Sequence, residues 1–294
     1  MATNTKLGDV GCSEIRRPIL SNAHVRLESI RVTGLSRTRT PETLSPEFQV
    51  LFPLEGVFFW HFGSRQALLD ANQILFVSAG DVSQDSHPEI GDVDCLVLTP
   101  GAGLLEAAWA CSIEGLAVQQ AFERRVMTSE PRLQQAAAAL AQCPLASTDP
   151  LVIEEAVIDL LAVAANHAGA RSGRRTRASK LTAAVKEIIA SCDDRISLLE
   201  IGERLGVSPT YLTDAFRRSE GLPISQYHRR LRLARALIEL PHTNDITALA
   251  LRFGFSSHAH FSTAFRAVFG QTPSEYRARA NQSDFRSLLR RAIN

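Results

Sequence analysis

The pattern of apolar and polar positions changes along the chain. Between Glu47 and Pro100, short runs rich in β-branched and aromatic residues are bounded by Gly, Pro, Asp and Asn. Such runs are typical of strands joined by tight turns. Because no helical pattern separates them, we expect a small antiparallel β-barrel or sandwich.

From about Leu104 the spacing of apolar residues becomes helical. Segments 104–110, 131–142 and 152–168 are rich in Ala and Leu at helical spacing. The stretch AGARSGRRTRASK, 168–180, is small and basic and predicts a flexible linker. Helical periodicity then returns from Leu181 almost to the end, so the fold class expected is α+β, with an N-terminal β-barrel and an all-α C-terminal domain.

Two segments of the C-terminal part, 198–227 and 246–276, resemble each other. Arg204 and Gly206 recur 48 positions later as Arg252 and Gly254. After one extra residue in the turn, Ser208, Ala215, Phe216, Gly221 and Tyr227 recur 49 positions later as Ser257, Ala264, Phe265, Gly270 and Tyr276. A duplicated supersecondary unit explains this agreement.

Each copy has the features of a helix-turn-helix. A short helix ends at Gly206 or Gly254, where a left-handed backbone conformation is needed. Ser208 or Ser257 then caps the next helix, in which an apolar pair at i and i+4 faces inward. These pairs are Leu212 with Phe216 and Phe261 with Phe265.

The inward pairs determine which residues of the second helices face outward, and these are our candidate DNA-binding residues. In the first copy they are Ser208, Pro209, Thr210, Thr213, Asp214, Arg217 and Arg218. In the second copy they are Ser257, His258, Ala259, His260, Thr263 and Arg266.

His258 and His260 also suggest a metal site by their His-x-His spelling. Residues at i and i+2 of a helix lie about 200° apart, so the two rings cannot grip one ion from a helix. We therefore expect no metal here. In the first turn of a helix that enters a groove, histidines can instead reach base edges or phosphates.

Charge is divided unevenly between the two halves. Residues 1–170 carry 11 Lys and Arg against 20 Asp and Glu, whereas residues 171–294 carry 21 against 11. A basic C-terminal half favours a polyanionic partner, although a charged face also keeps a protein in solution.

Several classes of protein do not fit the sequence. No apolar stretch reaches the ~18 to 20 residues that a membrane-spanning helix needs, and the N-terminus has no apolar signal core. The five cysteines, at 12, 95, 111, 143 and 192, form no CxxC cluster and are expected to be reduced thiols. We therefore expect a cytoplasmic protein with no membrane partner.

The C-terminal ~100 residues resemble the AraC/XylS class of bacterial transcription regulators. The run DITALALRFGFSSHAHFSTAFRAVFGQTPSEYR, with its GF, FS-x-x-F, FG and P-S-x-Y-R elements, is the most specific match. The resemblance implies two helix-turn-helix units joined by one helix, here 224–240, whose recognition helices enter successive major grooves about 34 Å apart. Arg217, Arg218, Arg229, Arg230 and Arg266 are suited to contacts with the DNA backbone, although an exposed basic face also serves solvation alone.

This sequence departs from the family at Asp214 and Thr263, where arginine is common. Asp214 can accept a hydrogen bond from a cytosine amino group, or it can pair with a neighbouring arginine. Both interpretations stay open.

Residues 48–89 resemble the cupin-like sensor modules of the same regulators. Cupin enzymes need a compact HxH…E…H set, but His61, His87 and Glu55 or Glu89 are scattered, and no HxH occurs before residue 258. We therefore expect no enzymatic activity and no cofactor. Phe59, His61 and His87 are the candidate effector-binding residues, with plain packing as the alternative for each.

These observations predict a DNA-binding transcription regulator. The predicted parts are an effector-sensing domain at 20–105, a helical segment for dimerisation at 106–167, a linker at 168–179 and a DNA-binding domain at 180–282. Its expected partners are double-stranded DNA, a small-molecule effector, RNA polymerase and a second copy of the chain. Two alternatives stay open: a cupin enzyme with an accessory DNA-binding tail, and a dimeric DNA-binding protein without an effector.

Overall fold

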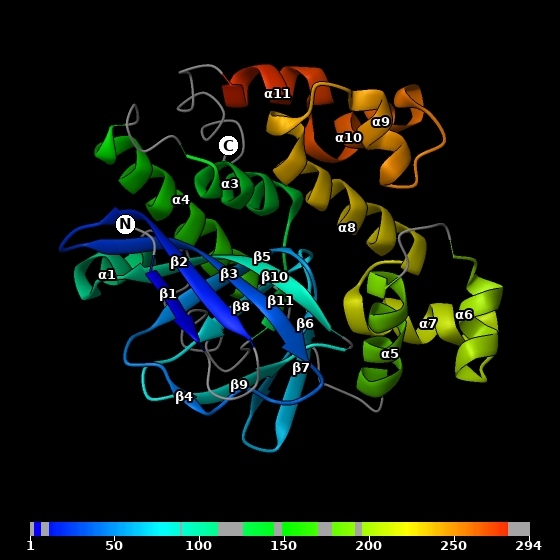
Figure 1. Cartoon of the computed structure of the whole chain (residues 1–294), viewed down its shortest axis with the longest axis horizontal. Helices are drawn as coiled ribbons and strands as arrows, with labels where there is room; N and C mark the ends of the chain where they lie inside the picture. Colours follow the sequence, from blue (N-terminus) through cyan, green and yellow to red (C-terminus); the bar gives the residue numbers. More distant parts are fainter. Residues whose placement is uncertain are drawn as a thin grey trace.

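The computed structural model describes residues 3–6, 12–88, 90–110, 126–143, 149–169, 178–191 and 196–281. Its N-terminal part is built mainly of strands and its C-terminal part of helices (Figure 1). The strands are β1 (Thr3–Lys6), β2 (Ser13–Ser21), β3 (Val25–Ser36), β4 (Thr43–Leu44), β5 (Gln49–Glu55), β6 (Phe58–Phe62), β7 (Arg65–Leu69), β8 (Gln73–Val77), β9 (Val82–Ser86), β10 (Ile90–Pro100) and β11 (Val126–Thr128).

The helices form two groups. Those of the first group are α1 (Ala102–Ala110), α3 (Pro131–Ala141) and α4 (Pro150–Gly169). Those of the second are α5 (Ala178–Ser191), α6 (Leu198–Leu205), α7 (Pro209–Glu220), α8 (Ile224–Glu239), the short 3₁₀ helix η2 (Leu240–His242), α9 (Ile246–Arg252), α10 (His258–Phe269) and α11 (Pro273–Asn281). The α+β class predicted from the pattern is confirmed.

The strands β3 to β10 form a jelly roll. One sheet has the order β1-β2-β3-β10-β5-β8-β11 and the other the order β4-β9-β6-β7. With β3 as the first of eight strands, the first sheet joins strands one, eight, three and six, and the second joins two, seven, four and five. This is the double-sheet jelly roll on which cupins are built, so the predicted cupin-like architecture is confirmed.

The strand-rich part extends beyond residues 20–105. Strand β2 begins at Ser13 and β1 pairs with it, while β11 adds to the other edge of the same sheet. The sequence of β2, SEIRRPILS, is mostly polar, so it lacks the apolar alternation on which a strand prediction depends.

The large sheet is apolar on both faces because each face is covered. Along β10, Val93, Cys95 and Val97 point into the core between the two sheets. Leu96 and Leu98, on the other face, pack against α3 and α4. This period-two alternation explains the unbroken apolar run that the sequence shows at this strand.

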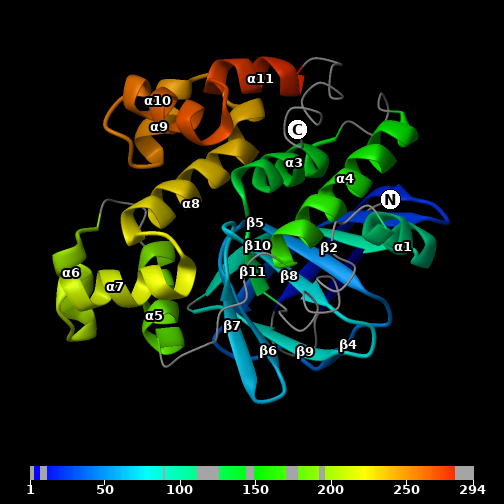
Figure 2. The ribbon, with the colours of Figure 1, turned by 180° about the vertical axis from the view of Figure 1, so that it is seen from behind.

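The same outer layer joins the two halves of the protein. Helices α3 and α4 cover the large sheet, and α3 lies between this sheet and α8, as both views show (Figures 1 and 2). One apolar core runs from the sheet through α3 into α8, α9 and α10. The predicted linker at 168–179 falls mainly on residues 170–177, which lie outside the described residues.

Three of the five cysteines are buried thiols, namely Cys12, Cys95 and Cys143. Cys111 and Cys192 lie outside the described residues. Within the part of the chain that the structure describes, no helix combines the length and the apolar character needed to cross a membrane.

A carboxyl group lies inside the jelly roll. Asp85 on β9 pairs with Trp60 on β6, and Trp60 belongs to the core between the sheets. One oxygen of Asp85, Oδ1, is buried and has no hydrogen-bond partner among the described residues. Burial, with a smaller contribution from the negative charge of Glu14, raises the pKa of Asp85 to about 7.

The raised pKa makes folding stability depend on pH. The folded protein holds the Asp85 proton more tightly than the unfolded chain, so stability is lost as the pH rises from about 4 through 7. We expect Asp85→Asn to raise the free energy of unfolding at pH 8 by on the order of 1 to 3 kcal/mol. The loss of stability between pH 5.5 and 8.5, measured by denaturant unfolding, should shrink in this variant.

Asp214→Asn, at an exposed residue, is the control and should show the same pH dependence of unfolding free energy as the wild type. An equal pH dependence in the wild type and in Asp85→Asn would show that Asp85 is already ionised in the folded protein at pH 5.5.

Candidate nucleic-acid interface

The first helix-turn-helix consists of α6, a tight turn and α7. Ser197 and Glu200 form a capping box at the start of α6, and Gly206 ends the helix with φ +65°. The Ser208 side chain then accepts a hydrogen bond from the Tyr211 N–H (3.3 Å) and caps α7. Leu212 and Phe216 are buried, as the i, i+4 spacing predicted.

The second helix-turn-helix repeats this construction with α9 and α10. Asp245 caps α9 by accepting from the N–H groups of Thr247 and Ala248, and Gly254 turns the chain with φ +69°. The Ser257 side chain accepts from the His260 N–H (3.1 Å) and caps α10. Phe261 and Phe265 are fully buried.

Helix α8 joins the two units. It spans Ile224–Glu239, close to the predicted 224–240, and its 16 residues make a rod of about 24 Å. Figure 1 shows α6 and α7 at one end of this rod and α9 and α10 at the other. Each unit contains its own recognition helix, α7 or α10.

The outward faces of both recognition helices are open to solvent. In α7 and its cap, Ser208, Thr210, Asp214, Arg217 and Arg218 are exposed, while Pro209 and Thr213 are half-buried. The Thr213 hydroxyl donates to the Pro209 carbonyl (2.9 Å), which satisfies its proton within the helix. All of the predicted outward residues of α10 are exposed, namely Ser257, His258, Ala259, His260, Thr263 and Arg266.

The two histidines of α10 have separate partners. Nδ1 of His260 lies 3.0 Å from the Ser256 hydroxyl, and the ring packs edge-on against Phe255, with centroids 5.5 Å apart. Nε2 of His258 lies 3.5 Å from the Ser262 hydroxyl. Among the described residues, no group of three or more His, Cys, Asp or Glu is arranged to hold a metal.

Arg230 and Asp214 have surroundings that bear on the contacts predicted for them. The Arg230 guanidinium is half-buried and donates to the carbonyl of Ser129, so this side chain turns toward the N-terminal part. Its contact with the DNA backbone stays a prediction. Asp214 is exposed, and no ion pair joins it to another described residue. Its contact with a base stays a prediction.

Tyr211 is a surface residue that the sequence analysis missed. It lies in the first turn of α7, 54% exposed. The signal was available, because Tyr211 precedes His260 by the 49 residues that separate the two copies. The equivalence places an aromatic side chain in the first unit where the second carries a histidine.

The N-terminal candidates do not gather in one cavity. Phe58 and Trp60 face the core between the sheets, so Phe59 and His61, on alternate positions of β6, lie on its outer face. There Nε2 of buried His61 lies 2.8 Å from the Ser86 hydroxyl. Phe59 and His61 therefore do not face the core between the sheets, because the pleat turns Phe58 and Trp60 inward.

His87 lies against Gly91 of β10. Its ring approaches Gly91 so closely that a Cβ added there would meet Nε2 at 2.6 Å. A small pocket does lie between β5, α3 and α8, but it is lined by none of the three candidates. Glu89 lies outside the described residues.

A family model described as a helix-turn-helix domain matches residues 201–279, which span both units. In these residues the chain is similar to AraC-type transcription regulators. The chain is 36% identical over 85 residues to the transcriptional activator AarP of Providencia stuartii, covering 29% of this chain and 63% of that protein.

Two further proteins are similar to this chain. The transcriptional regulator ArgR of Pseudomonas aeruginosa is 39% identical over 99 residues, covering 33% of this chain and 30% of that protein. An AraC-type DNA-binding domain from Chromobacterium violaceum is 38% identical, covering 35% of this chain and 93% of that structure, with a TM-score of 0.32. The chain thus spans less than two thirds of the curated relatives AarP and ArgR.

The positive φ of Gly206 allows the turn of the first unit to be tested by substitution. A Cβ at Gly206 would meet no atom within 4 Å, so Gly206→Ala would suffer only from its left-handed backbone. We expect this variant to lose about 1 kcal/mol of unfolding free energy, measured in denaturant.

Gly103→Ala is the matched control, because a Cβ at this exposed position of α1 also meets nothing within 4 Å and φ is not positive there. It should be neutral or stabilising. Equal effects of the two substitutions would contradict the role of the left-handed turn.

Proposed function

We propose that the protein is a DNA-binding transcription regulator in which α7 and α10 enter successive turns of the major groove. The observation that carries the proposal is the duplication itself. Two capped helices, each buried on one side and exposed with polar residues on the other, are held at the two ends of α8. A protein with a single reading surface has no need of this arrangement.

Affinity and specificity come from different residues in this proposal. Arg217 and Arg266 are equivalent in the two copies and both exposed, which suits contacts with phosphates that release counterions. Thr210, Asp214, His258, His260 and Thr263 lie on the outward faces and have the polar groups needed to contact base edges.

The N-terminal half regulates rather than catalyses. We infer that the jelly roll senses a small molecule and that the region 106–167 mediates dimerisation, as in the regulators that the chain resembles. A ligand then acts by binding one arrangement of the two halves better than another. We also propose that the protein contacts RNA polymerase and acts in the cytoplasm.

Selection of duplexes from a random pool by the full-length protein tests the function. Enrichment of a sequence with two separately spaced conserved blocks, one helical turn apart, is the expected result. Recovery of no preferred sequence, at low salt and with the folded protein, would exclude sequence-specific binding.

Arg217→Ala should weaken binding to all duplexes alike. We expect the slope of log affinity against log salt to flatten by about one unit, since one phosphate contact is lost. The measurement is a salt titration on the selected duplex and on an unrelated one. Arg132→Ala, on α3 outside both units, is the control and should change neither affinity; a loss confined to one sequence would assign Arg217 to base contact instead.

His260→Ala should alter base preference in one half of the site. The free ring nitrogen, Nε2, is the atom available to DNA, because Nδ1 faces Ser256. Repeated selection with this variant should relax one block by about 1 kcal/mol or more per base and leave the other intact. His242→Ala, exposed on η2, serves as the control, and an unchanged preference profile for His260→Ala would remove it from the interface.

A further inference from the structure

The turn between β7 and β8 is buried in the first helix-turn-helix unit. Asp70 and Asn72 are 0% exposed and Ala71 is 4% exposed. Ala71 belongs to the same apolar cluster as Leu212 and Phe216 of α7. A turn of the jelly roll therefore completes the core of a DNA-binding unit.

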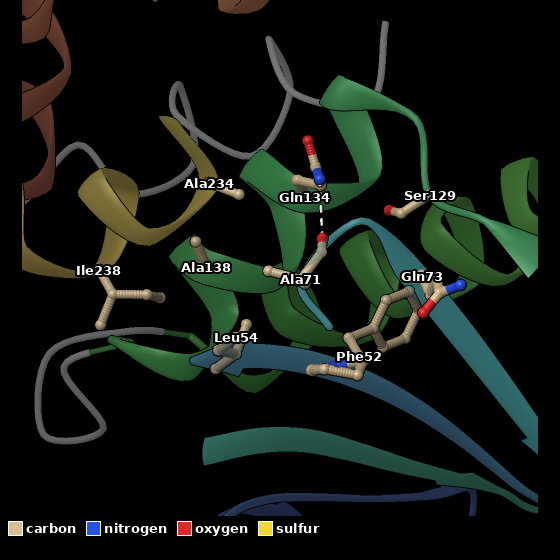
Figure 3. A pocket seen from close by; sticks show the side chains of 11 residues that line it. Phe52, Leu54, Ala71, Gln73, Ser129, Gln134, Ala138, Ala234 and Ile238 are labelled. Carbon is tan, nitrogen blue, oxygen red and sulfur yellow. Dashed lines mark hydrogen bonds between the residues drawn. The ribbon is translucent and has the colours of Figure 1, made fainter. Parts of the chain in front are cut away.

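Hydrogen bonds fix this turn from both sides. Asp70 Oδ1 accepts from the Asn72 N–H (2.8 Å), and Gln134 Nε2, on α3, donates to the Ala71 carbonyl (2.7 Å) and to Asn72 Oδ1 (3.0 Å). Figure 3 shows the Gln134 amide pointing at Ala71. Since buried polar groups are costly to leave unpaired, this network selects one geometry for the turn.

The turn contacts α8 through a tyrosine. The Tyr227 hydroxyl donates to Asp70 Oδ2 (2.7 Å), and Asn72 Nδ2 donates to the Tyr227 carbonyl (3.1 Å). Burial, together with the negative charge of Asp70, holds the pKa of Tyr227 well above its usual value, so the phenol stays protonated and donates.

Tyr227 in turn contacts the first recognition helix. Its ring meets Phe216 of α7 edge-on, with centroids 5.2 Å apart and planes at 83°. Lys186 of α5 lies over the same ring at 5.3 Å and pairs with Glu220, the last residue of α7, at 2.9 Å. A continuous line of buried contacts thus runs from Asp70 through Tyr227 to α7.

The second unit has the same aromatic pair without the polar anchor. Tyr276 and Phe265 follow Tyr227 and Phe216 by 49 residues, and their ring centroids lie 6.0 Å apart. The Tyr276 hydroxyl is fully buried but has no hydrogen-bond partner among the described residues. The duplication therefore supplies an internal comparison for the role of Asp70.

We propose that Asp70 is a positioning residue for DNA recognition: through Tyr227 it fixes the first recognition helix α7, and not α10, to the jelly-roll domain. The inference rests on the proposed function for its DNA consequence. A change in the jelly roll that moves the β7–β8 turn is transmitted to one half of the DNA site, while the other half keeps its reading.

Hydrogen exchange on the full-length protein without DNA tests the positioning directly. In Tyr227→Phe, which removes the hydroxyl and keeps the ring, the amides of α7 should exchange about tenfold faster while those of α10 hold their rate. Tyr276→Phe is the matched control and should leave α7 unchanged. Equal acceleration in both recognition helices, or none in α7, overturns the proposal.

Asp70→Asn guards against a folding defect in Tyr227→Phe. The amide keeps one oxygen to accept either the Tyr227 hydroxyl or the Asn72 N–H, but it cannot serve both as the carboxylate does. We expect the same asymmetric acceleration in α7, of smaller size. Acceleration confined to the jelly roll would assign Asp70 a role within its own domain alone.

Footprinting on the duplex selected by the wild type gives the DNA consequence. Protection should weaken in Tyr227→Phe only in the block that His260→Ala leaves intact. Loss in both blocks, or only in the block that depends on His260, contradicts the proposal. If no duplex is selected at all, the proposed function fails, and the exchange rates of α7 and α10 still decide the role of Asp70.

Discussion

Helix α8 supplies apolar side chains to two separate cores at once. Leu231, Ala234 and Tyr227 pack with α5 and α7. Leu233 and Leu237 pack with α3, α9 and α10. Because α8 belongs to both cores, each helix-turn-helix unit is packed against this helix through a separate set of side chains, and both are tied to the N-terminal half.

The two units share a construction but differ in how they are supported. The turn of the second unit is held by Arg232 of α8, which donates to the carbonyls of Phe253 and Gly254 and lies over the Phe255 ring at 4.7 Å. The first unit is supported by the jelly-roll turn at Asp70–Asn72. The two recognition helices of the duplicated sequence are therefore supported by different contacts. This allows them to respond differently to the N-terminal domain.

Strands of the jelly roll that are covered on both faces are apolar along their whole length. In β8 and β10, both faces are buried because helices cover one side and the second sheet covers the other. Asp85 is the exception inside, a carboxyl opposite Trp60 whose pKa is raised by its burial.

The sequence by itself determined the features that depend on neighbours along the chain. The turn glycines, the capping serines and the i, i+4 apolar pairs specify each helix-turn-helix, because φ, caps and helical periodicity are local properties. The 49-residue repeat added the equivalence of the two units, and it even contained the signal for exposed Tyr211. Only the tertiary structure decided which face of β6 turns inward, because Phe58, Phe59 and Trp60 are all apolar and the period alone does not choose between faces. It also decided that Arg230 binds Ser129 and that Asp70 meets Tyr227, since partners 101 and 157 residues apart are brought together by packing and not by any local pattern.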